Sequence, residues 1–99
     1  MFVEIKKSNN PRKKLMAIFY DKDKKKIKTV HFGQAGAEDF TITNDEKQKE
    51  LYRKRHLKDL KTNDYMRAGY LAYFVLWSKP TLKASIAHYM KMFKLKKYN

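Results

Sequence analysis

An uncharged apolar segment, Ala68–Trp77, constrains the fold of this chain more than any other part of its sequence. The segment has about half of the ~20 residues that a membrane-spanning helix needs, so we expect no membrane span. With the residues before it, it forms a run over 65–77 that is too long for a typical strand. We therefore expect a central buried helix here, with a buried strand as the weaker alternative. The aromatic stripe of this helix would consist of Tyr70, Tyr73, Phe74 and Trp77.

Residues 2–33 have the pattern of a small antiparallel sheet. Leu15–Tyr20 is an apolar run of strand length, and the Asp- and Lys-rich stretch Asp21–Lys25 after it is typical of a hairpin connection. The next run alternates apolar and polar residues and ends at Gly33. Phe2–Lys7 alternates weakly and predicts a third strand. We therefore expect two to three strands in this part of the chain.

Two further helices are predicted on either side of the apolar run. The sequence from Thr43 to Glu46 matches a capping box, which predicts that a helix begins there. Ser78 is a suitable N-cap, and Pro80 is tolerated in the first turn of a helix, so a last helix is expected to follow them.

The predicted fold class is therefore α+β. A small antiparallel sheet of two to three strands, over about residues 2–33, is followed by three helices, at about 44–58, 65–77 and 79–95. No linker divides the sequence, so we expect a single domain over 1–99.

Basic side chains outnumber acidic ones at both ends of the chain. The sequence has 24 Lys and Arg against 10 Asp and Glu, and its net charge of +14 divides into +7 for residues 1–33 and +7 for residues 61–99. An aromatic content of 14% is too high for a disordered basic tail. Only four of the basic residues are arginine, and lysine suits phosphate contacts better than bidentate contacts to bases. The composition thus favours a folded protein that binds nucleic-acid backbones without reading their sequence.

The lysines of the hairpin and of the C-terminal segment are the candidate contacts to nucleic acid. The hairpin lysines would form a charged finger that lies along a row of phosphates. The alternative is a solvated strand tip whose lysines only discourage edge-to-edge pairing. Two arginines of the helix expected at about 44–58 complete the set. The predicted nucleic-acid-binding residues are Lys22, Lys24, Lys25, Lys26, Lys28, Lys91, Lys94, Lys96, Lys97, Arg53 and Arg55.

The sequence contains no recognisable catalytic or metal-binding motif. It has no cysteine, and its three histidines lack the spacing of zinc ligands. His56 is expected to be half-buried and hydrogen-bonded rather than catalytic. The acids between Glu38 and Glu46 are a weak alternative as a magnesium-dependent nuclease site, against local roles in a loop and a helix cap. We therefore expect no enzyme, no cofactor and no metal, and the lack of a signal-peptide core near Met1 predicts that the protein is not secreted.

Several short strings occur together in an order that resembles a known protein family. They are Val30-His31-Phe32-Gly33, Asp39-Phe40-Thr41-Ile42, Arg55-His56, Ala68-Gly69-Tyr70 and Leu76-Trp77-Ser78-Lys79-Pro80-Thr81-Leu82. Over about residues 14–93 the chain resembles the small basic uncharacterised proteins of large nucleocytoplasmic DNA viruses, which share an FG…DYT segment, an RH pair and a TAG…LLWxKPTL ending. Phe40 stands where that family often has Tyr, and Leu71–Tyr73 replaces a serine-containing stretch.

This resemblance implies a virus-encoded protein that is found in the virion or in the cytoplasm or nucleus of the infected host cell. It implies no reaction. The special positions that it implies are Gly33, Asp39, Arg55, His56, Gly69, Trp77 and Pro80. We therefore predict a non-enzymatic, viral DNA-associated protein that contacts phosphates through lysine-rich surfaces. The alternative is a structural virion component, a cement or core-lining protein that binds an acidic protein surface.

Overall fold

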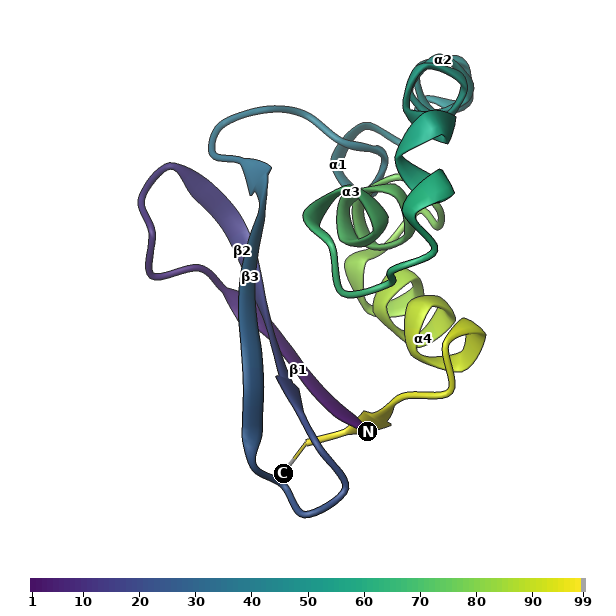
Figure 1. Ribbon diagram of the computed structural model, residues 1–99. Helices are drawn as coiled ribbons and strands as arrows, with labels where there is room; N and C mark the ends of the chain where they lie inside the picture. The colour runs from purple at the N-terminus through teal and green to yellow at the C-terminus, as the bar shows by residue number, and fades with distance from the viewer. Residues whose placement is uncertain (99) are drawn as a thin grey trace.

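The protein consists of a four-stranded sheet with helices packed on one of its faces (Figure 1). The computed structural model describes residues 1–98. Strands β1 (Phe2–Lys7), β2 (Lys13–Tyr20) and β3 (Lys26–Gln34) form an antiparallel meander, and β4 (Lys96–Lys97) pairs with β1 in parallel. The strand order is β3-β2-β1-β4, so the first and last strands of the chain are neighbours.

The chain is helical between β3 and β4. Its helices are α1 (Phe40–Thr43), α2 (Glu46–His56), the 3₁₀ helix η1 (Leu57–Thr62), α3 (Ala68–Leu71), the π-helix η2 (Ala72–Leu76) and α4 (Leu82–Met92). α3 packs on β3, and α4 packs on η2. α2 lies at the opposite end of the molecule from the turn between β2 and β3 (Figure 1). Every helix in residues 1–98 is too short or too polar to cross a membrane.

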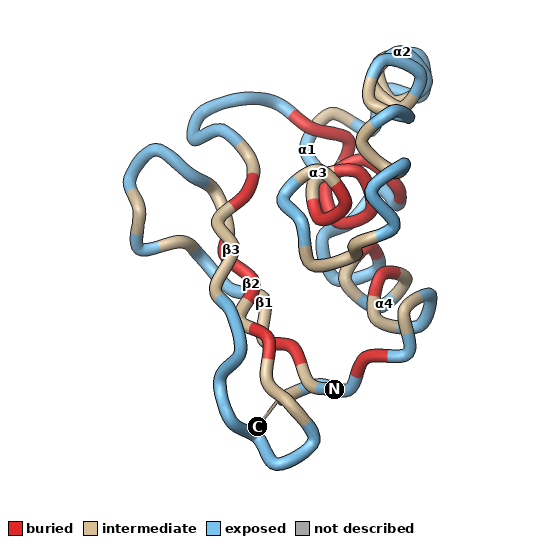
Figure 2. Tube along the Cα trace, viewed as in Figure 1, coloured by how far each residue is buried: buried red, intermediate tan, exposed pale blue. Residues whose placement is uncertain are grey.

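The core lies between the sheet and the helices. Alternation along the strands turns every second side chain toward the helices, and Val3 on β1 and its partner Phe19 on β2 are 2% and 0% exposed. Phe32 on β3 continues the same face. On the helical side, Val75 and Tyr89 are completely buried. Figure 2 shows the buried segments of both layers facing one another, whereas α2 is intermediate to exposed and the β2–β3 turn is mostly exposed.

The prediction of a two- to three-stranded sheet is wrong, because the C-terminal segment adds the fourth strand. The Lys96 N–H donates to the Met1 carbonyl (N···O 3.0 Å), and the Tyr98 N–H donates to the Val3 carbonyl (3.1 Å). Leu95 is buried against the core just before this strand. Two consecutive exposed lysines show no apolar alternation, so the local sequence contains no strand signal here. The sheet is thus mixed, although the α+β class fits the structure.

The prediction of three helices is wrong as well, because residues 1–98 contain four α-helices. α1 is a single turn, and its N-cap Asp39 was expected to be an ordinary loop residue. The continuous helix expected over 65–77 is instead divided into α3 and the wider π-helix η2, which ends before Trp77. The Ser78 hydroxyl donates to the Phe74 carbonyl (2.5 Å) and so caps this helical end rather than beginning the next helix.

The helices expected at 44–58 and 79–95 are shorter than predicted, because other residues cap them. The Asp45 carboxylate, and not Thr43, accepts the first free N–H groups of α2. The Thr81 hydroxyl accepts the Ala84 N–H at the start of α4 (3.1 Å). α4 ends at Met92, and Lys94 has a left-handed backbone (φ 54°) that turns the chain toward β4.

Candidate functional site

The turn between β2 and β3 is held by one carboxylate, which leaves its lysines free for a partner. The Oδ1 atom of Asp21 accepts the N–H groups of Asp23 and Lys25, both at 2.9 Å. The Asp21 N–H also donates to the Lys25 carbonyl (2.9 Å), and Lys24 has a left-handed backbone (φ 62°). Asp at such a position supplies the hydrogen bonds of the turn itself. The predicted lysine finger is therefore a closed, ordered turn.

The C-terminal segment is attached beside this turn by aromatic contacts. The Tyr98 ring stacks on the Tyr20 ring, with their centroids 3.6 Å apart and their planes 10° from parallel. Lys96 lies opposite Phe2 in the parallel ladder, and the Lys24 ammonium lies 5.3 Å from the centre of the Phe2 ring. The β2–β3 turn and the C-terminal strand therefore meet at one end of the sheet.

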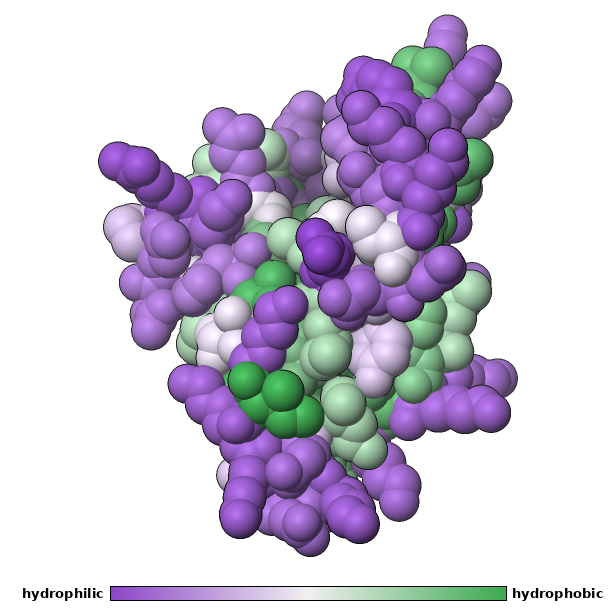
Figure 3. All heavy atoms as spheres, viewed as in Figure 1, coloured by the Kyte–Doolittle hydropathy of each residue, from purple (hydrophilic) through white to green (hydrophobic). Residues whose placement is uncertain are grey.

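We call this part of the surface the lysine end. It consists of the exposed lysines Lys22, Lys24, Lys25, Lys26, Lys96 and Lys97, with the half-buried rings of Phe2, Tyr20 and Tyr98 between them. The space-filling view shows hydrophilic side chains over this end of the molecule and a more apolar band above it (Figure 3). The three rings are not among the residues predicted from the sequence, although Tyr98 directly follows two lysines.

Two of the three carboxylates at the lysine end are engaged within the protein, whereas the third, Asp23, is exposed between Lys22 and Lys24. Asp21 holds the turn, and Glu4 lies 3.4 Å from the Tyr20 hydroxyl and 3.7 Å from the Lys6 ammonium. Partial burial, followed by the charge of Glu4, raises the pKa of Tyr20 above its ordinary value. A phenol with the ordinary pKa of 10 is already neutral at physiological pH, and this shift moves Tyr20 further from ionisation.

The other predicted lysines are exposed outside the lysine end. Lys28 is exposed on β3, Lys91 is exposed in the last turn of α4, and Lys94 is exposed in the turn that leads to β4. The structure thus brings the hairpin lysines together with Lys96 and Lys97 of β4, whereas Lys91 and Lys94 lie earlier, on α4 and on the turn that follows it.

The two predicted arginines lie elsewhere, on α2. The Arg53 guanidinium packs 4.2 Å above the centre of the Tyr73 ring, and its Nη1 donates to the Trp77 carbonyl (3.0 Å). Arg53 therefore joins α2 to the core and has little freedom to contact a ligand. Arg55 is exposed but belongs to the opposite end of the molecule from the lysine end (Figure 1).

A second cluster of polar and aromatic groups joins α2 to the core. The Tyr52 ring stacks between the rings of His56 and Trp77, with centroid distances of 4.2 and 4.3 Å. The half-buried His56 Nδ1 lies 3.1 Å from the Asp59 carboxylate. Burial, followed by the charge of Asp59, raises the pKa of Tyr52. His56 is half-buried and hydrogen-bonded as predicted, but its partner three residues later was not recognised in the sequence.

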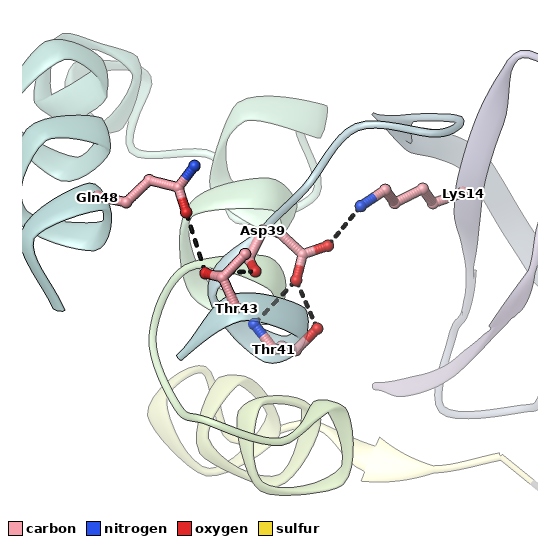
Figure 4. A network of polar contacts seen from close by, with 5 residues as sticks. All are labelled: Lys14, Asp39, Thr41, Thr43 and Gln48. Carbon is pink, nitrogen blue, oxygen red and sulfur yellow. Dashed lines mark hydrogen bonds and ion pairs between the residues drawn. The ribbon is translucent and has the colours of Figure 1, made fainter. Parts of the chain in front are cut away.

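Asp39 is the centre of a buried polar network that connects the sheet to the helices (Figure 4). It is 3% exposed, and its Oδ2 accepts from the Lys14 ammonium on β2 at 2.6 Å. Its Oδ1 accepts from the Thr41 N–H (2.9 Å) and the Thr41 hydroxyl (2.5 Å). Asp45 serves as the cap of α2, so these two acids have separate structural roles. No three His, Asp or Glu residues of the described chain are grouped as a metal site.

Comparison with known proteins identifies one family. The family of unknown function DUF5754 matches residues 3–56, which extend from β1 to the end of α2 and include the lysine turn. No curated protein and no solved structure matches the chain.

Proposed function

We propose that this chain, which belongs to the family of unknown function DUF5754, binds nucleic acid through phosphate contacts and catalyses no reaction on it. One observation supports the proposal: lysines from the β2–β3 turn and from the C-terminal strand meet at one end of the sheet, held together by the stacked rings of Tyr20 and Tyr98. The residues that we propose to contact phosphates are Lys22, Lys24, Lys25, Lys26, Lys96 and Lys97.

The arrangement suits a polyanion because the lysines are gathered before the ligand arrives. Each lysine that neutralises a phosphate releases condensed counterions, which drives association without any contact to a base. The turn held by Asp21 and the ladder between β4 and β1 fix the backbone that carries these lysines. Only the long side chains then have to become ordered on binding.

The lysine ammonium group is compact and strongly hydrated, which favours contacts with the nucleic-acid backbone over recognition of base edges. Given the motif resemblance, we propose viral DNA as the nucleic acid, bound in the virion or in the infected cell. The aromatic rings of the lysine end serve mainly to hold its two segments together, since Tyr20 and Tyr98 stack on each other.

A salt titration with a matched pair of variants tests this proposal. The first variant replaces Lys24, Lys25 and Lys26 by glutamine, and the control replaces three exposed lysines near α2 instead, namely Lys47, Lys54 and Lys58. Both variants lose the same charge. Affinity for a short labelled DNA duplex is measured by fluorescence anisotropy over a range of salt concentrations.

We expect the slope of log affinity against log salt to become shallower by about 2.7 in the first variant, since each lost phosphate contact removes about 0.9. The control should keep the slope of the unmodified protein. Equal changes in the two variants would show that only total charge matters and would refute the lysine end as the site. Preferential binding of polyglutamate over DNA would instead support an acidic protein surface as the partner.

A further inference from the structure

Most of β1 has a neighbouring strand on one side only. β2 pairs with all six of its residues, whereas β4 pairs with Phe2 and Val3 alone. The last hydrogen bond on the β4 side runs from the Tyr98 N–H to the Val3 carbonyl (3.1 Å). Within residues 1–98, Glu4–Lys7 therefore forms an open edge of the sheet.

The direction of the backbone groups along this edge follows from the register. Successive residues of a central strand direct their N–H and C=O groups to opposite neighbours. Val3 bonds to β4, and Ile5 and Lys7 lie two and four residues after it. Their N–H and C=O groups therefore point to the same side of β1 as those of Val3, beyond the end of β4. The edge thus presents backbone donors and acceptors that can extend the ladder of β4.

An apolar groove of about 560 Å³ runs beside the open edge, between β1 and α4. Val3 and Ile5 line it from the strand, and Ile86 and Met90 line it from the helix. Leu82, at the start of α4, also lines the groove and is 37% exposed. The groove therefore offers apolar contacts directly beside the hydrogen-bonding groups of the edge.

The charged residues around the groove are mainly basic. They are Lys6, Lys83 and Lys97, against the single acid Glu4. Glu4 already lies near Lys6 and the Tyr20 hydroxyl. The surroundings of the groove thus favour a negatively charged ligand.

We propose that this edge and groove bind an acidic protein segment in extended conformation, which adds to β1 as a new strand beyond the end of β4. Every second side chain of the segment would be apolar and enter the groove, and the side chains between would be carboxylates that face the side of the sheet where Lys6 lies. The lengths agree. Glu4–Lys7 covers about 13 Å, with four residues at about 3.3 Å each, and Leu82–Met90 covers about 14 Å, with nine residues at about 1.5 Å each.

A second copy of the chain does not fit this edge. Two β1 strands side by side would place Lys6 and Lys7 of both copies along one short ladder, in proteins that each carry a net charge of +14. Repulsion between two such basic surfaces opposes this pairing. Charge complementarity therefore selects an acidic partner. Unlike the lysine end, this surface offers both backbone hydrogen-bonding groups of β1 and an apolar groove.

Binding of synthetic peptides tests the proposal. The probe is a short peptide that alternates valine and glutamate, and the comparison peptides are a version of the same composition with its valines grouped and a version N-methylated at alternate amides. Affinity is measured by isothermal titration, and the location of binding by amide chemical-shift changes. We expect the alternating peptide to bind about tenfold more tightly than both comparison peptides, with shifts at Ile5 and Lys7.

Variants distinguish this site from charge alone. Ile86→Glu places a carboxylate in the groove and should abolish the preference for the alternating peptide, whereas Met92→Glu, at a 53% exposed position of the same helix, should keep it. Replacing Lys24, Lys25 and Lys26 by glutamine should also keep it, since none of these three lysines lines the groove. Equal binding of all three peptides, or a stable dimer through β1 in sedimentation experiments, would overturn the proposal.

Discussion

Replacing Asp39 by asparagine isolates the charge of the buried ion pair from the rest of its network. Asparagine keeps the shape of the side chain and an oxygen that can accept the Thr41 N–H, so α1 retains its cap. The change removes the negative charge opposite the Lys14 ammonium, which lies 2.6 Å from it. The lysine is then left among the core residues without its partner.

The size of the effect follows from the burial of the two groups. The Asp39 side chain is 4% exposed and that of Lys14 is 16% exposed. Removing one partner of a buried pair costs about 3–5 kcal/mol, and because Lys14 keeps some contact with solvent we expect about 3 kcal/mol. The Lys14→Met variant should lose a similar amount, and the double variant should lose about 2 kcal/mol less than the sum.

Urea unfolding followed by the fluorescence of Trp77, the single tryptophan, measures this loss. With a slope of about 1–3 kcal/mol/M, a loss of about 3 kcal/mol lowers the midpoint by about 1–3 M. Asp45→Asn is the matched control, because Asp45 is an exposed helix cap with no ion-pair partner. If Asp39→Asn costs no more than Asp45→Asn, or the two single losses simply add, the ion pair does not hold the sheet to the helices.

Two further predictions concern stability. Gly33 and Gly36 both have positive φ (78° and 81°), but a Cβ on Gly33 would lie 2.8 Å from the Leu76 side chain, whereas one on Gly36 would meet nothing within 4 Å. Gly36→Ala should cost about 1–2 kcal/mol and Gly33→Ala about 1–3 kcal/mol more; equal losses in urea unfolding would contradict the contact with Leu76. Burial, followed by the charges of Lys79 and Arg53, lowers the pKa of His88 below its ordinary 6.5. Below about pH 6.5 the unfolded chain then binds more protons than the folded one, so stability should fall with falling pH, and His88→Asn should flatten this fall; an unchanged pH profile of the unfolding midpoint would refute it.

The parts of the fold that the sequence predicts are those with local signals. β1, β2 and β3 lie where alternation and the Asp-rich turn predict strands, because each pattern covers neighbouring residues. β4 carries no such pattern, and its partner is at the other end of the chain. Its position depends on the burial of Leu95 and the stacking of Tyr98, which only the folded molecule reveals.

In the candidate site, too, the residue types were predictable from the sequence, whereas the contacts between distant residues were not. The sequence suggested the lysines as candidates, but it could not show that Lys24 lies over the Phe2 ring while Lys96 pairs with Phe2 in the ladder. Arg53 was chosen for its charge, whereas its contacts with Tyr73 and Trp77 depend on how α2 packs on η2. Asp39 was treated as one of several loop acids because its partner, Lys14, lies on a distant strand.

The pairing of β4 with β1 also determines when the proposed binding surface comes into existence. During synthesis β1, β2 and β3 leave the ribosome first, and hairpins can form as soon as they emerge. The last lysines of the surface follow only after the whole helical layer has been made. In a nascent chain, only the lysines of the β2–β3 turn are therefore in place. Its affinity for a polyanion would increase in a late step, when residues 96–98 join the sheet.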